Sequence, residues 1–234
     1  MSRPVRLSRT RAGRRSRPDE ASGFDPVLLD LDGTVIDSVG LIRESHRHAV
    51  TSVLGENLSD ERLVANVGRP LIDQMRAFSP ERAEELLRVY REWNHANTDA
   101  LLRPYPGLDA LLDALVADGR RLGIVTSKSG PTVDLAWKVV PLRDRFDVVI
   151  TSEDTERHKP DPAPVLAALE QLGRAPEGAC YVGDAPFDLR AGRAAGVATI
   201  GVTWGFFTRE ALEAEDPDLI VDTPAELLRA CRGR

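Results

Sequence analysis

From Pro104 onward, short apolar runs alternate with segments of helical periodicity, and this alternation constrains the fold more than any other feature of the chain. Leu108, Leu111 and Leu115 recur at helical spacing, whereas Leu122–Val125 is a continuous apolar run typical of a buried strand. Further strands are expected at Phe146–Ile150, Cys180–Val182, Val197–Val202 and Leu219–Val221, and helices at Pro131–Val139, Pro162–Leu172, Phe187–Ala195, Arg209–Ala214 and Ala225–Cys231. Strands separated by helices are joined by parallel crossovers, so the sequence predicts an α/β fold with a doubly wound parallel sheet.

A long helical insert interrupts this pattern after its first strand. Val27–Leu29 has the character of a buried strand, but residues 38–102 contain no convincing strand. Leu41–Leu54 makes one amphipathic face, and a second face combines Ala83, Leu86, Leu87 and Tyr90 with Trp93 or Asn94. Pro104, Pro106 and Gly107 are typical of a return hinge. We therefore expect a core of residues 24–37 and 103–234, with residues 38–102 forming a helical cap over the end of the first strand.

The charge distribution separates a basic N-terminal stretch from an acidic body. Residues 1–23 carry seven arginines against Asp19 and Glu20, a net +5, which leaves −11 for the rest because the whole chain carries −6. We expect residues 1–23 to be a disordered basic tail, with an organelle address or a basic binding arm as alternatives. The acidic body argues against nucleic acid as the main ligand.

Two further features of the composition bound the setting of the protein. No apolar run approaches the roughly 20 residues of a membrane span, so no membrane segment is expected. The two cysteines, Cys180 and Cys231, have neither the number nor the spacing of a disulfide framework or a metal site. A reducing, cytoplasmic setting is therefore expected.

Residues 30–34, Asp-Leu-Asp-Gly-Thr, directly follow the first strand and offer two carboxylates. Asp30 and Asp32 point to the same side of an extended segment because side chains alternate with period two. Such a pair can hold one cation and leave an oxygen free to attack, which makes Asp30 a candidate nucleophile and Asp32 a candidate acid and base. A turn or a helix cap would also explain the pair alone.

Other strands of the same pattern also end in polar groups. Thr126 and Ser127 follow Leu122–Val125, where a hydroxyl and backbone N–H groups can bind phosphate. Only three of the 31 basic residues are lysines, and Lys128 and Lys159 lie at such positions. A compact ammonium fits against a phosphoryl oxygen, so Lys128 is a candidate for phosphate binding and Lys159 for balancing the charge of Asp30.

A second acidic pair follows the expected strand Cys180–Val182. Asp184 is placed to ligate a metal ion, and carboxylate-rich oxygen ligation suits Mg²⁺. Asp188 would ligate it directly, act through water, or only begin the next helix as a favourable partner of the helix dipole. We favour an outer role for Asp188.

Taken together, residues 30–34, Thr126, Lys159-Pro160 and the Gly183–Asp188 run resemble the four ordered motifs of the haloacid dehalogenase superfamily, phosphatase branch. The resemblance implies a Rossmann-like core with an inserted cap and an aspartyl-phosphate mechanism. It also implies Mg²⁺ bound by the side chains of Asp30 and Asp184 and the backbone carbonyl of Asp32. Dehalogenases lack an acid at position 32, and phosphosugar mutases usually carry Glu-Asp where this chain has Gly-Asp, so a phosphatase is expected and a mutase is a weaker alternative.

Two subfamilies compete for the substrate. Thr203–Gly205 and Pro217–Leu228 resemble phosphoglycolate phosphatases, whereas Tyr90–His95 and Gly68–Leu71 resemble the cap of inorganic pyrophosphatases of the superfamily. Arg69 departs from the pyrophosphatase pattern, which has proline at this position. An arginine here would clamp a carboxylate or a second phosphate of the substrate, or would lie on the surface of a loop. We expect a Mg²⁺-dependent hydrolase of small phosphorylated metabolites, phosphoglycolate phosphatase-like, with pyrophosphatase as the alternative, and a monomer or homodimer.

Other classes of function fit the sequence less well. A phospho-acceptor receiver domain has its paired acids and its acceptor aspartate on different strands, whereas here Asp30 and Asp32 share one. A non-catalytic nucleotide-binding module is disfavoured because neither a phosphate-binding loop motif nor a dinucleotide fingerprint is present. His46, His48 and His95 lie singly in the helical insert, which is not a pattern typical of a zinc site.

Overall fold

The computed structural model describes residues 23–233 and contains a six-stranded parallel sheet. The strands are β1 (Val27–Leu29), β4 (Leu122–Val125), β5 (Val148–Ile150), β6 (Cys180–Gly183), β7 (Ala198–Val202) and β8 (Leu219–Val221). Their order across the sheet is β5-β4-β1-β6-β7-β8. This order confirms the predicted α/β fold with a doubly wound parallel sheet. The predicted basic tail, residues 1–23, lies outside the described residues except for Gly23.

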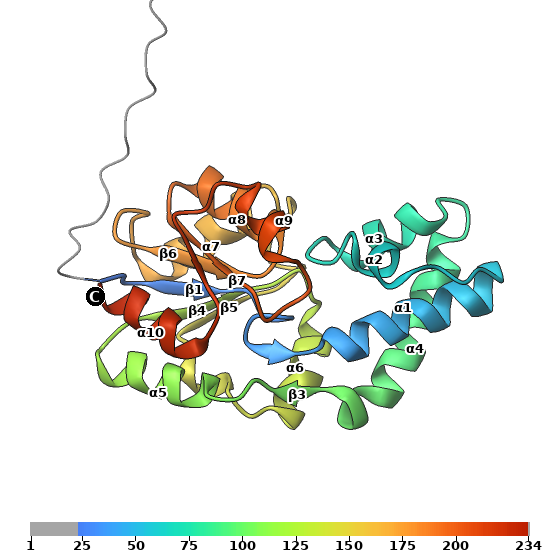
Figure 1. Cartoon of the computed structure of the whole chain (residues 1–234), viewed down its shortest axis with the longest axis horizontal. Coiled ribbons are helices and arrows are strands. Elements are labelled where there is room, and N and C mark those ends of the chain that lie inside the picture. Colours follow the sequence, from blue (N-terminus) through green and yellow to red (C-terminus); the bar gives the residue numbers. More distant parts are fainter. Residues whose placement is uncertain (1–22, 234) are drawn as a thin grey trace, which may run out of the picture.

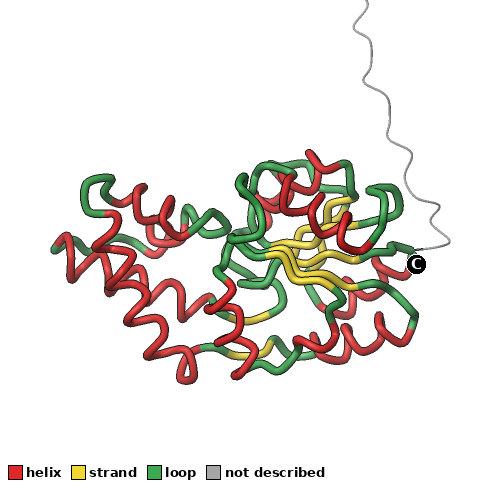
Figure 2. Tube along the Cα trace, turned by 180° about the vertical axis from the view of Figure 1, so that it is seen from behind, coloured by secondary structure: helices red, strands yellow, loops and turns green. Residues whose placement is uncertain are grey.

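Helices cover both faces of the sheet (Figures 1 and 2). The helices of the core are α5 (Leu108–Ala117), α6 (Gly130–Val139), α7 (Ala163–Leu172), α8 (Pro186–Ala195), α9 (Arg209–Glu213) and α10 (Pro224–Arg232). Apolar residues of α5, α6 and α10 share one buried cluster with one face of the sheet, and those of α7 and α8 share a second cluster with the other face. The helices therefore sit where the apolar stripes of the sequence predict, within a few residues at their ends.

Strand β1 lies near the centre of the sheet and is buried on both sides. Val27 and Leu29 belong to the cluster on one face and Leu28 to the cluster on the other, as period-two alternation requires. On the adjacent strand, a Cβ atom added to Gly123 would lie 2.7 Å from side-chain carbons of both Leu28 and Val148. A glycine is therefore required beside Leu28 for the two strands and their neighbours to pack.

Four helices form the insert: α1 (Val39–Leu54), α2 (Asp60–Val64), α3 (Leu71–Phe78) and α4 (Ala83–Leu101). The two long helices, α1 and α4, lie side by side in both views (Figures 1 and 2). The four helices enclose an apolar cluster of their own, which includes Met75 and Leu86. On α4 the predicted face is buried with Asn94, while Trp93 is only partly buried.

Two very short strands connect the insert to the core. β2 (Ile36–Asp37) and β3 (Arg103–Pro104) pair antiparallel, with Ile36 opposite Pro104 and Asp37 opposite Arg103. The sequence does not predict this pairing, because two residues are too few to show a strand pattern. Within residues 23–233, none of the helices combines the length and the apolar character needed to cross a membrane.

Truncation of Leu28 tests the packing of the central strand. We expect Leu28→Ala to lower the free energy of unfolding by about 2–5 kcal/mol, because the side chain is fully buried and leaves a cavity beside Gly123. Leu219→Ala, on edge strand β8 and 41% exposed, is the matched control and should cost less than about 1 kcal/mol. Urea denaturation measures both, and equal losses would contradict the assignment of β1 to the core.

Candidate active site

The predicted site residues meet where the strand order reverses. β1 lies between β4 and β6, and Asp30, Thr126 and Asp184 each directly follow one of these three strands. The sheet pattern of hydrogen bonds extends to the first two, because the N–H of Asp30 donates to the Val182 carbonyl at 2.8 Å and that of Thr126 to the Ile150 carbonyl at 2.9 Å. Ligands of doubly wound sheets bind at this kind of crevice, beyond the carboxyl ends of the strands.

Lys159 connects two of the predicted carboxylates. Its ammonium donates to Oδ1 of Asp30 at 2.8 Å and to Oδ1 of Asp188 at 2.6 Å, and all three side chains are buried. Burial alone would lower the pKa of Lys159, but the charges of Asp188 and Asp30 raise it well above its ordinary value. The buried ammonium therefore stays charged and holds Asp30 in place.

Both carboxylate oxygens of Asp188 have partners within the protein. Besides the Lys159 ammonium, the hydroxyl of Tyr181 lies 3.2 Å from its Oδ1, and the backbone N–H of Ala185 donates to its Oδ2 at 3.1 Å. The last contact caps the first turn of α8. The surroundings of Asp188 therefore favour the outer role expected from the sequence, in which it positions Lys159.

Asp184 lies in a narrow seat made by glycines. Its Oδ1 accepts from the Thr34 hydroxyl at 3.0 Å and its Oδ2 from the backbone N–H of Phe206 at 2.7 Å. A Cβ atom added to Gly33 or to Gly205 would lie 2.5 or 2.1 Å from Oδ2, so neither position accepts a larger residue without displacing the carboxylate. Phe206 and Gly205 were not predicted as site residues, because contacts of the backbone leave no side-chain signal in the sequence.

The electrostatics of the site favour an additional cation. Carboxylate oxygens of Asp30, Asp184 and Asp188 all lie within 4.8 Å of one another and all three residues are buried. Burial raises the pKa of Asp30 to about 7 despite Lys159, and burial together with the charges of Asp188 and Asp30 raises the pKa of Asp184 well above its ordinary value. The Lys159 ammonium contacts Asp30 and Asp188, whereas Asp184 is held by neutral donors, so a divalent cation with a preference for oxygen fits beside Asp30 and Asp184.

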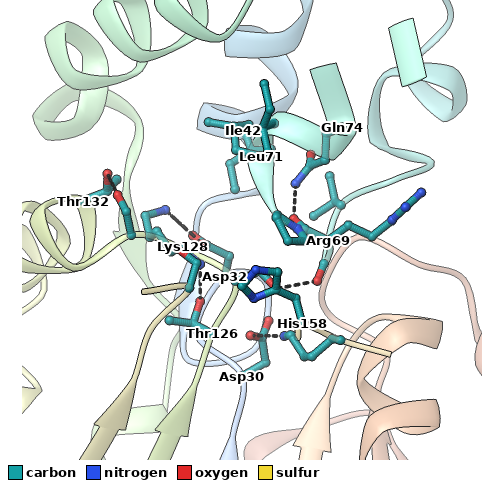
Figure 3. Close-up of a pocket in the computed structure, with 18 of the residues that line it drawn as sticks. Asp30, Asp32, Ile42, Arg69, Leu71, Gln74, Thr126, Lys128, Thr132 and His158 are labelled. Carbon is teal, nitrogen blue, oxygen red and sulfur yellow. Dashed lines mark hydrogen bonds and ion pairs between the residues drawn. The ribbon is translucent and has the colours of Figure 1, made fainter. Parts of the chain in front are cut away.

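Asp32 points to a different partner. Both of its carboxylate oxygens accept from the Lys128 ammonium, at 2.8 and 3.0 Å, and the backbone N–H of Lys128 donates to the Thr126 hydroxyl at 3.2 Å (Figure 3). Lys128 was predicted to bind phosphate, and its ion pair with Asp32 was not expected from the sequence. The structure thus brings Asp32, Thr126 and Lys128 together beside the cluster of three carboxylates.

A cavity of about 270 Å³ lies between the strand ends and the helical insert. Asp30, Asp32, Thr126, Lys159 and Asp184 line it from the core. From the insert it is lined by the loop before α3 and by side chains of α4, namely Tyr90, Arg91, Asn94 and His95. The sequence analysis does not name these α4 residues as site residues; their i, i+4 spacing, Tyr90 with Asn94 and Arg91 with His95, was the available signal.

Ser127 and Arg69 both lie where the insert meets the core. The hydroxyl of Ser127 donates to the backbone carbonyl of Gly68 at 2.7 Å and so joins the β4 loop to the insert. Arg69 lines the cavity, but its guanidinium extends away from Asp30 (Figure 3) and lies 6.0 Å from the ring centroid of Phe187. In this structure Ser127 and Arg69, two of the four predicted phosphate ligands, therefore contact other protein groups.

Known proteins are similar to this chain in sequence and in fold. The haloacid dehalogenase-like hydrolase family model matches residues 27–202. A pyrophosphatase PpaX from Anoxybacillus flavithermus is 39% identical over 205 residues, covering 88% of this chain and 95% of the relative. A predicted phosphatase from Clostridium acetobutylicum has a TM-score of 0.79 at 27% identity, covering 89% of this chain and 98% of that one. A predicted phosphoglycolate phosphatase from Haemophilus somnus has a TM-score of 0.81 at 24% identity, covering 88% and 97%.

These matches agree with the four motifs read from the sequence and with the sheet order. The family match spans the described strands from β1 to β7. The resemblance noted in the sequence is confirmed. The chain belongs to the haloacid dehalogenase-like hydrolases and is a phosphatase of that superfamily.

Proposed function

We propose that this phosphatase is Mg²⁺-dependent and transfers the phosphoryl group of a small metabolite to Asp30. The observation that carries the proposal is the convergence of Asp30, Lys159 and Asp184 at the floor of one cavity. The Lys159 ammonium holds Oδ1 of Asp30 and reduces the repulsion between this carboxylate and an anionic substrate. Water would then hydrolyse the acyl phosphate and regenerate Asp30.

The other residues of the floor complete this chemistry. Asp30 and Asp184 would hold Mg²⁺ with the backbone carbonyl of Asp32, and the bound ion would neutralise phosphoryl charge during transfer. Thr126 would donate its hydroxyl to a phosphoryl oxygen. Asp32 would give a proton to the leaving oxygen and later take one from water. The ammonium of Lys128 contacts both carboxylate oxygens of Asp32, so this ammonium has to move before Asp32 can transfer a proton.

The substrate we favour is a small molecule with two anionic groups, and pyrophosphate is the first candidate. The relatives named pyrophosphatase PpaX align with the insert as well as the core, at 36–39% identity over 86–88% of this chain. The cavity is small and several cationic side chains line it, among them Lys128, Arg91 and Arg69. Phosphoglycolate is the second candidate, because it also carries two anionic groups and because Thr203–Gly205 and Pro217–Leu228 resemble phosphoglycolate phosphatases.

Replacement of the nucleophile tests the mechanism. We expect Asp30→Asn to reduce turnover by at least about a thousandfold, because the amide cannot form the acyl phosphate. Asp113→Asn, an exposed carboxylate on α5 paired with Arg145, is the control and should keep normal turnover. Phosphate release in the presence of Mg²⁺ measures both. Near-normal activity of Asp30→Asn, with a normal thermal melt, would remove Asp30 as the nucleophile.

The raised pKa of Asp30 predicts how stability depends on pH and metal. In the folded state the Asp30 carboxyl has a pKa of about 7, whereas its ordinary value is 3.8. The stability from this group is therefore fully present below about pH 3.8 and is lost as the pH rises through about 7. We expect the Tm of the metal-free protein to fall between about pH 5 and pH 8. Mg²⁺ should raise the Tm more at pH 8 than at pH 5, and at a hundredfold excess over its Kd it adds up to about 2.7 kcal/mol to the free energy of unfolding. Calorimetry with and without a chelator checks this, and an equal effect of Mg²⁺ at both pH values would argue against ligation by Asp30.

A substrate comparison tests the role of Arg69. If the guanidinium swings to the second anionic group, Arg69→Ala should lower kcat/KM for pyrophosphate by about tenfold to a hundredfold. Hydrolysis of p-nitrophenyl phosphate, which lacks a second anion, should change little. Arg88→Ala, an exposed position on α4 paired with Glu92, is the matched control. A similar loss on both substrates would assign Arg69 to structure, and parallel assays with phosphoglycolate rank the two candidate substrates.

A further inference from the structure

The loop that forms the insert's wall of the cavity, residues 67–70, is held from two sides. We call it the cavity loop. On the core side, Ser127 donates to the carbonyl of Gly68. On the insert side, the amide Nε2 of Gln74 in α3 donates to the carbonyl of Arg69 at 2.7 Å (Figure 3). The first bond crosses from core to insert, whereas the second lies within the insert and does not depend on how the two parts approach.

Behind Gln74 lies a histidine with unused hydrogen-bonding capacity. His46 of α1 is fully buried, and its ring packs against Phe78 and Tyr90 with centroids 5.4 and 4.9 Å apart. Three atoms have no hydrogen-bond partner among the described residues: the two ring nitrogens of His46 and the Oε1 of Gln74. Phe78, which the His46 ring contacts, lies one helical turn after Gln74 on α3, so the unpaired atoms of His46 and Gln74 belong to the same part of the insert. Burial of unpaired polar groups is costly, so these atoms need an explanation.

The chemistry of the two side chains makes them partners. Burial lowers the pKa of His46 to about 3, and a contact with the Gln74 side chain opposes that shift. A neutral imidazole carries one N–H donor. The amide of Gln74 has its orientation set by the Arg69 carbonyl, which needs the Nε2 donor, so Oε1 is left as an acceptor. The donor that His46 has and the acceptor that Gln74 has are therefore complementary.

We infer that His46 is a positioning residue of the active site: a small rotation of the two side chains from their arrangement in this structure lets its N–H donate to Oε1 of Gln74, and Gln74 in turn holds the Arg69 carbonyl and the cavity loop in the shape that receives the substrate. His46 touches neither the substrate nor Asp30 and acts only through Gln74. Its kinetic consequence rests on the proposed phosphatase function. Because both bonds lie within the insert, they hold the shape of the loop independently of the Ser127 bond that joins it to the core.

Replacement by a ring without a donor separates positioning from packing. His46→Phe keeps an aromatic ring between Phe78 and Tyr90 but removes the N–H. We expect KM for pyrophosphate to rise about tenfold, with kcat within about twofold and no loss of Tm, because Gln74 loses the donor that fixes it. His48→Phe is the matched control: it lies on the same helix, is exposed and stacks on Trp93 at 5.8 Å. A role in packing alone would leave KM unchanged.

Two further variants test the path through Gln74. Gln74→Met should raise KM to a similar extent, and the double variant His46→Phe with Gln74→Met should be no worse than either single variant. Additive effects would overturn the chain of contacts. His46→Asn and His46→Gln each place an amide N–H at position 46. At least one of them should have a lower KM than His46→Phe, close to that of the wild type. Gln74→Met also serves as the test if His46→Phe does not fold.

A spectroscopic measurement makes the inference independent of activity. Long-range ¹H–¹⁵N spectra of the imidazole should show His46 as a single neutral tautomer between about pH 5 and pH 8, and the side-chain amide signal of Gln74 should shift in His46→Phe but not in His48→Phe. An unshifted Gln74 signal would overturn the inference. If the wild type hydrolyses no phosphate compound with Mg²⁺, the proposed function fails, while this spectrum still decides the pairing of His46 with Gln74.

Discussion

The concentration of buried negative charge at the end of β1 is the constraint on which the rest of this structure depends. Three carboxylates have oxygens within 4.8 Å of one another, and the ammonium of Lys159 contacts two of them, those of Asp30 and Asp188. Such charges persist in a protein interior only when they are paired and hydrogen-bonded, and the surrounding chain supplies those partners. Thr34, the N–H of Phe206 and the N–H of Ala185 each donate to one of the acidic residues, so loops far apart in the sequence are fixed by the same cluster.

The arrangement of layers explains why the charge lies at that place. The core strands are nearly all apolar, and their polar successors can only collect beyond the carboxyl ends, at the point where β4 and β6 diverge on either side of β1. The insert closes over this point with an apolar cluster of its own and adds polar wall residues, while Leu41 of α1 and the partly buried Trp93 of α4 join the cluster on one face of the sheet. The shape of its cavity loop then depends on a second polar cluster, His46 with Gln74, inside the insert.

Much of the core was predictable because its signals are local. Apolar runs marked every strand of the sheet, and Asp30, Thr126 and Asp184 could be placed together because parallel strands end at one edge. The contacts of Lys128 with Asp32 and of Ser127 with Gly68 were not predictable, since each joins segments 59 to 96 residues apart through side-chain rotamers that no spacing encodes. The same holds for the seat of Asp184: glycines at positions 33 and 205 look like ordinary turn residues until the carboxylate is seen against them.

The antiparallel pairing of β2 and β3 also has an evolutionary consequence. The chain leaves the sheet at Asp37 and returns at Arg103, and these two residues face each other across a single short ladder. A segment whose ends are adjacent can be lengthened, shortened or replaced by another one without changing the order of the strands that carry the acidic residues. The same catalytic residues of the core could thus be combined with different inserted caps. Substrate selectivity could then diversify by exchange of the insert while the reaction catalysed by the core stays the same.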